Sequence, residues 1–188
     1  MLLYNSIYIC NKVKVMNKIK LIILSIIVIG AVALRMLLAD FPNVAPITAL
    51  ALFVGIFFEK KYLAFIIPAI VMLASDFFIG FHSTMWGVYG AFGLIALLGI
   101  YMQNKINVIS MIGASLGASL LFFAITNFAV WTTGSWYPTN FSGLIECYVA
   151  AIPFFGKTIV SDLLFTGVFV GGFMLAQSKI PALAEVKS

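Results

Sequence analysis

Long apolar runs, broken by short polar or proline-containing stretches, constrain this chain more than any other feature. The run from Ala64 to Trp86 reads AFIIPAIVMLASDFFIGFHSTMW. About 20 apolar residues are enough to cross a bilayer as a helix. Of the 188 residues, 63% are hydrophobic and 9% are charged, whereas soluble domains are about half apolar and a quarter charged. The sequence therefore predicts an all-α membrane protein.

Six apolar segments are expected to form one polytopic helix bundle. Turn-rich or charged stretches separate the segments, which cover residues 19–38, 47–58, 62–80, 86–102, 107–130 and 151–176. The bundle then spans residues 19–176, between tails at 1–18 and 177–188. The stretch from Trp131 to Tyr148 is polar and rich in turn residues, so a short interfacial or re-entrant helix from about Ser142 is expected before the last span.

Two alternatives concern the N-terminal region. Translation could begin at Met16, which would make the first fifteen residues an artefact of gene prediction. Ala31-Val32-Ala33 resembles a signal-peptidase site. We favour an uncleaved span, because the apolar run continues to Leu38.

The lysines predict the orientation. In the six-span order nine lysines fall on one side, and only Arg35 and Lys157 fall towards the other. Cytoplasmic loops carry the excess of Lys and Arg. Both termini are therefore expected in the cytoplasm, with the protein a multi-pass component of the inner (cytoplasmic) membrane. The small residues from Gly113 to Ser119 predict a close helix-packing face.

A polar cluster is expected near the outer ends of the spans. A carboxylate in a span is costly, about 2.5–3.5 kcal/mol at the helix centre on insertion scales, yet Ser75-Asp76 and Ser161-Asp162 repeat one motif in two spans. The candidate substrate-binding residues are Arg35, Asn43, Asp76, His82, Trp86, Asn127, Trp131, Glu146, Lys157 and Asp162. Arg35 and Lys157 would bind anionic groups, the two aspartates would accept hydrogen bonds or pair with them, and tryptophans including Trp136 would cover the ligand.

Each of these residues also has an explanation without a ligand. Arg35 could reach lipid headgroups or form a structural bridge to Asp76, and Lys157 could pair with Asp162 within its helix. The tryptophans could belong to an ordinary interfacial belt. His82 fits an interfacial residue better than a metal ligand.

Several functional classes are excluded or disfavoured. GxxxxGK[ST], HExxH and GxSxG are absent, so no catalytic residues are assigned and no enzyme is expected. The two cysteines, Cys10 and Cys147, lie far apart and form no CxxC motif, so no metal site and no cofactor is expected. The lysines lie in separate loops, which disfavours nucleic-acid binding.

Several stretches carry a family resemblance: Pro42–Gly55 (PNVAPITALALFVG), Ser75-Asp76 with Gly80 and His82, Ser119–Trp131 and Tyr137–Phe155. With these stretches the chain resembles a family of uncharacterised bacterial membrane proteins described as transport proteins. That family is similar to the substrate-binding S components of energy-coupling-factor (ECF) vitamin transporters. The resemblance implies six membrane helices, a vitamin or metal ion bound near the outer face, and as partners a transmembrane coupling subunit and ATPases.

The expected function is therefore membrane-embedded binding and uptake of a small molecule such as a vitamin or its precursor. One alternative is a structural or assembly protein whose polar residues only lock helix packing. Another is a solitary proton-coupled carrier that uses Asp76 or Asp162 as its proton site. One departure from S components is that the first span lacks the Ala-x-x-x-Ala spacing, which occurs instead at Ala45 and Ala49.

Overall fold

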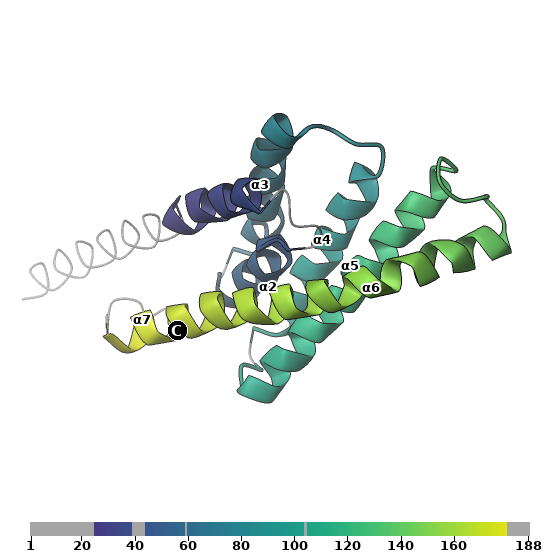
Figure 1. Ribbon diagram of the computed structural model, residues 1–188. Coiled ribbons are helices and arrows are strands. Elements are labelled where there is room, and N and C mark those ends of the chain that lie inside the picture. The colour runs from purple at the N-terminus through teal and green to yellow at the C-terminus, as the bar shows by residue number, and fades with distance from the viewer. Residues whose placement is uncertain (1–24, 39–43, 59, 104, 180–188) are drawn as a thin grey trace, which may run out of the picture.

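The computed structural model describes residues 25–38, 44–58, 60–103 and 105–179, and in these ranges it contains helices and no strand (Figure 1). The first described helix is Ser25–Leu37. It is followed by α2 (Ile47–Phe57), α3 (Leu63–Ile79), α4 (Met85–Tyr101), α5 (Val108–Thr132), α6 (Phe141–Thr166), the π-helical turn η1 (Gly167–Gly171) and α7 (Gly172–Lys179). The all-α prediction is confirmed for this part of the chain.

Local sequence signals explain where several helices begin and end. Asn107 caps α5 by accepting a hydrogen bond from the Ser110 amide at 2.8 Å, and Asn140 caps α6 through the Gly143 amide at 2.9 Å. At the end of α3, Gly80 has φ +112°, a conformation that L side chains rarely adopt.

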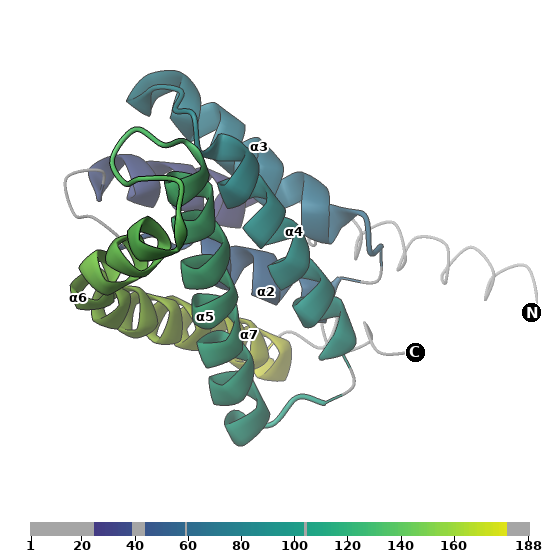
Figure 2. The ribbon, with the colours of Figure 1, turned by 90° about the vertical axis from the view of Figure 1, so that its right-hand side faces the viewer.

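Helix α2 is the centre of the fold. Every residue from Ile47 to Ile56 is buried, and α2 packs against α3, α4, α5 and α6. Figures 1 and 2 place it among these neighbours. A helix that is hydrophobic on all sides is expected to be buried all round.

Helices α2 and α4 approach each other at backbone distance. A Cβ atom added to Gly99 would lie 2.6 Å from the Leu52 carbonyl oxygen, and one added to Gly55 would lie 2.8 Å from the Ala96 carbonyl oxygen. Only glycine fits at these two positions without a shift of the backbone. The small-residue face predicted on α5 is partly buried: Ala114, Ser115, Ala118 and Ser119 are inside, whereas Gly113 meets open space.

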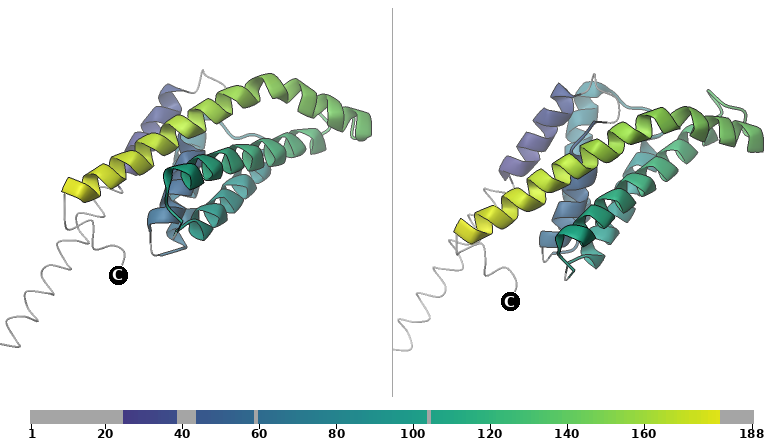
Figure 3. Two further views of the ribbon diagram at one scale, coloured as in Figure 1. Left: turned by 90° about the horizontal axis from the view of Figure 1, so that it is seen from below. Right: turned by 60° about the horizontal axis from the view of Figure 1, so that its bottom comes forward.

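The prediction of a separate short helix before the last span is wrong. Phe141–Lys179 is one continuous 39-residue helix that comprises α6, η1 and α7. Pro153 lies inside α6 without ending it, and Figure 3 shows the helix curving along its length. Proline removes one backbone hydrogen bond and bends a helix, so the polar start and the apolar remainder stay in one element.

Two helices, α5 and the continuous Phe141–Lys179 helix, are long and apolar enough to cross a membrane. The other apolar helices, Ser25–Leu37, α2, α3 and α4, are shorter. The observed helix ends from α2 to α5 lie within two residues of the predicted segments.

Candidate functional site

A cavity of about 250 Å³ lies between the Ser25–Leu37 helix and the helices from α2 to α6. Three of the predicted site residues line it: Arg35, His82 and Asp162. Among the described residues, Thr48 and Thr158 are the other polar side chains that line it, and the rest of the described lining is apolar. The predicted polar cluster therefore forms only in part, because three of its members meet at this cavity.

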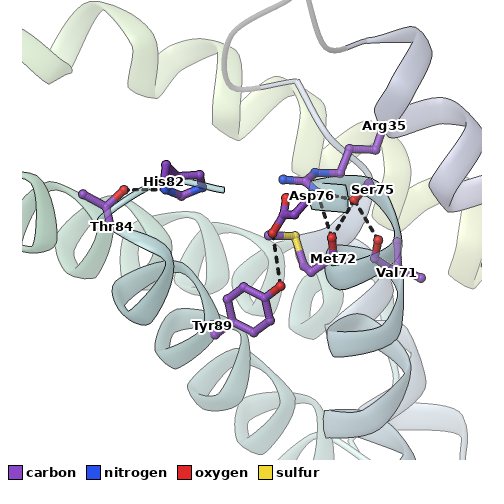
Figure 4. Close-up of polar contacts among 8 residues, drawn as sticks. All are labelled: Arg35, Val71, Met72, Ser75, Asp76, His82, Thr84 and Tyr89. Carbon is purple, nitrogen blue, oxygen red and sulfur yellow. Dashed lines mark hydrogen bonds and ion pairs between the residues drawn. The ribbon is translucent and has the colours of Figure 1, made fainter. Parts of the chain in front are cut away.

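Arg35 lies at one wall of this cavity and is bound to α3 (Figure 4). Its Nη1 atom lies 2.7 Å from Asp76 Oδ1. The same nitrogen donates to Ser75 Oγ and, at 3.4 Å, to the Met72 carbonyl oxygen. The Asp76 side chain is 1% exposed and that of Arg35 is 16% exposed. This is a largely buried, hydrogen-bonded ion pair between two helices.

Tyr89 of α4 completes the environment of Asp76. Its hydroxyl donates to Asp76 Oδ2 at 3.1 Å, so each oxygen of the carboxylate has a partner. Figure 4 shows Tyr89 reaching Asp76 from the side opposite Arg35. The cluster of Arg35, Ser75, Asp76 and Tyr89 therefore joins the first described helix to α3 and α4.

Asp162 of α6 has a different environment. It is 2% exposed, and its Oδ2 atom accepts a hydrogen bond from Ser119 Oγ of α5 at 2.7 Å. The Thr48 hydroxyl is a second hydrogen-bonding neighbour. No described lysine, arginine or histidine lies within ion-pairing distance of this carboxylate.

His82 lies in the loop between α3 and α4, is exposed, and lines the cavity. Its Nδ1 atom is 2.9 Å from Thr84 Oγ1. No group of three or more His, Cys, Asp or Glu side chains that could hold a metal ion occurs within the described ranges.

Most of the other predicted site residues lie away from this cavity. Trp86 is exposed, and the Asn127 side chain donates to the Phe123 carbonyl within α5. The Trp131 indole donates to the Pro138 carbonyl oxygen at 3.0 Å, and exposed Glu146 accepts from Ser142. Asn43 lies outside the described residues. The predicted tryptophan cover, which included Trp136, does not form over the cavity.

Lys157 is exposed on α6 and lines a neighbouring pocket with Ser161. No ion pair joins it to Asp162, although both residues lie in the described part of the chain. The internal pair considered from their spacing is therefore absent. Ser161 Oγ is buried and has no hydrogen-bond partner among the described residues.

Sequence reasoning missed Tyr89, Ser119, Thr48 and Thr158 as members of the polar clusters. Tyr89 lies near the start of a predicted span, where interfacial aromatic residues are common, and Ser119 ends the small-residue face predicted from Gly113 to Ser119. These residues could have been found from the rule that buried polar groups need hydrogen-bond partners. A hydroxyl group on a neighbouring span can supply such a partner for a buried aspartate.

The family comparison covers most of the chain. Residues 15–183 match the model of DUF6580, a family of unknown function, and the chain belongs to this family. No curated protein and no solved structure matches the chain.

Proposed function

We propose that this chain is a multi-pass membrane protein that binds a small molecule for uptake, either as a transporter or as a substrate-binding subunit like the ECF S components. The proposal rests on one observation above all: a cavity inside a strongly apolar helix assembly, with Asp162 in its wall. Ligand sites are typically concave and mostly apolar, with a few polar groups that fix orientation.

The outer surface of the helices supports a membrane location. On α3 the exposed large side chains include Ile66, Ile70, Leu73 and Phe77, and α5 exposes a similar apolar set. Soluble monomers rarely expose continuous apolar surface on this scale. Lipid contact accounts for these faces without a protein partner.

The proposed topology has six spans and cytoplasmic termini in the inner membrane. Its support is the distribution of lysines: Lys60 and Lys61 follow α2, Lys105 follows α4, and Lys179 ends α7. The span count includes helices shorter than a full bilayer crossing, such as α2, which is surrounded by protein. A short helix is tolerated there because its backbone groups are satisfied within the protein.

Native mass spectrometry of the purified full chain tests the proposal. We expect a discrete small-molecule adduct on the parent protein. Thr158→Leu places extra bulk in the cavity wall and is expected to remove the adduct. Val160→Leu, at an exposed position on the same helix and outside this cavity, is the matched control and is expected to keep it.

Uptake into proteoliposomes and co-purification then separate the two forms of the proposal. A chain that works alone accumulates the identified molecule without ATP. An S-component-like chain needs a coupling subunit and ATPases, which a pull-down would recover. An adduct unaffected by Thr158→Leu, or a bare spectrum together with no uptake in either format, contradicts the proposal.

A structural role is the second candidate, because both carboxylate oxygens of Asp76 have partners, Arg35 and Tyr89, without a ligand. Ala45 and Ala49 have the Ala-x-x-x-Ala spacing that resembles the docking seam of S components. Of these two residues, Ala49 is buried. A purely structural protein would lose stability when Asp76 is replaced and would never be stabilised by a small molecule.

A further inference from the structure

Asp162 is a buried carboxylate whose charge nothing in the described structure balances. Its hydrogen-bonding neighbours, Ser119 and Thr48, are neutral hydroxyls. A carboxylate has about four acceptor positions, so capacity remains for a further donor. A buried charge is strongly unfavourable unless it is paired.

The one arginine at the cavity does not supply this balance. Arg35 is engaged by Asp76 at 2.7 Å, so the two charges cancel as a pair. His82 is exposed and interacts with Thr84 in the loop. Among the described residues of the cavity wall, Asp162 is therefore the carboxylate without a cationic partner.

The rest of the wall favours an organic body over a hydrated ion. Ile47, Met72 and Val88 contribute apolar surface, and the rings of Phe92 and Phe122 lie with centroids 5.4 Å apart. Aromatic faces attract cations and also pack against apolar groups. A hard metal ion takes about six to eight oxygen ligands, and the described part of this wall offers one carboxylate and a few hydroxyls.

The size of the cavity limits the ligand. At roughly 30 Å³ for each water, about 250 Å³ corresponds to about eight waters, or a molecule on the order of ten non-hydrogen atoms. A compact amine with a short aliphatic chain or a single ring fits this volume.

We propose that the cavity binds a small organic monocation, an amine whose protonated nitrogen pairs with Asp162 and whose apolar or aromatic body packs against Phe92 and Phe122. This proposal rests on the proposed function and names the ligand class of the same site. It differs from the expectation that Arg35 and Lys157 bind an anion, because Arg35 is already paired and Lys157 is outside this cavity.

The test compares two probes of the same shape that differ in charge. The full chain in lipid nanodiscs is titrated with 2-phenylethylamine, which is protonated at neutral pH, and with the neutral alcohol 2-phenylethanol. Empty nanodiscs give the partitioning into lipid. Ligand-observed NMR is expected to show at least tenfold tighter binding of the amine to the parent protein.

Asp162→Asn tests whether the carboxylate causes this preference. Asparagine keeps the size of the side chain and can still accept from Ser119, so the fold is expected to persist. The variant is expected to lose the preference for the amine and to bind both probes similarly. Equal binding of the two probes by the parent protein overturns the proposal, and so does an amine preference that survives in Asp162→Asn.

A second variant keeps the test valid if Asp162→Asn does not fold. Thr158→Leu fills the cavity but leaves the carboxylate, so it is expected to abolish amine binding; unchanged binding refutes this site.

The cation proposal and the proposed function are refuted by different results. Equal binding of amine and alcohol removes the cation proposal and leaves a small-molecule site, whereas the absence of any co-purified or accumulated molecule removes the proposed function.

Discussion

Replacing Asp76 with asparagine is expected to lower the free energy of unfolding by about 3 kcal/mol. Removing one partner of a buried ion pair typically costs roughly 3–5 kcal/mol, because the other charge remains without compensation. The lower end applies here because the remaining charge, on Arg35, belongs to a side chain that is 16% exposed. The Tyr89 hydroxyl can still donate to the asparagine oxygen.

Arg35→Met is expected to destabilise more than Asp76→Asn, towards the upper end of the same range of about 3–5 kcal/mol. This substitution leaves the Asp76 carboxylate, which is 1% exposed, without its cationic partner. Tyr89 is then the remaining hydrogen-bond donor to Asp76 in this cluster. The double variant is expected to be more stable than Arg35→Met, since neither charge remains. A double-mutant cycle built from these four proteins isolates the energy of the pair.

Reversible unfolding in mixed micelles, followed by tryptophan fluorescence, measures all four proteins. Asp162→Asn is the matched control, because it makes the same chemical change in the other Ser-Asp motif. It is expected to remain within about 1 kcal/mol of the parent protein or to be more stable, since it removes a charge without a counterion. Additive losses in the cycle, or equal losses for Asp76→Asn and Asp162→Asn, would refute the reasoning.

Two further predictions concern α4. Gly99→Ala is expected to lower the free energy of unfolding by about 1–3 kcal/mol, because the added methyl group would overlap the Leu52 carbonyl of α2. Gly93→Ala is the control in the same helix: its added methyl group meets open space, so no destabilisation is expected in the same unfolding assay. Tyr89→Phe removes one donor from Asp76 and is expected to cost about 1 kcal/mol, and a loss as large as that of Arg35→Met would show that the arginine is not the main partner.

The helices could be predicted from the sequence because apolar runs and their polar interruptions determine where each helix lies. The Asn107 cap and the Gly80 stop fall where the predicted segments begin and end. The end of the polar stretch before the last span was misread as a separate helix. Asn140 marked the true start of that helix, whereas Pro153, which looks like a break, only bends it.

The candidate site was predictable in kind and less so in membership. The cost of burying a carboxylate identified Asp76 and Asp162 as residues that need partners. Their partners depend on which helices become neighbours, and a single sequence does not encode that directly. The central position of α2 follows from its apolar surface, which Thr48 alone interrupts. That Thr48 lies beside Asp162 follows only from the packing.

The two Ser-Asp motifs are locally alike but have different consequences in the fold. Ser75-Asp76 faces the helix that carries Arg35, 41 residues earlier in the chain than Asp76. The Asp76 charge is therefore paired with Arg35 and links the two helices. Ser161-Asp162 faces α5, which supplies only the Ser119 hydroxyl. A buried charge left without a counterion is a liability for stability that a structural role does not explain. The proposed cation in the adjacent cavity would supply the missing counterion, so we propose a structural role for the first motif and ligand binding for the second.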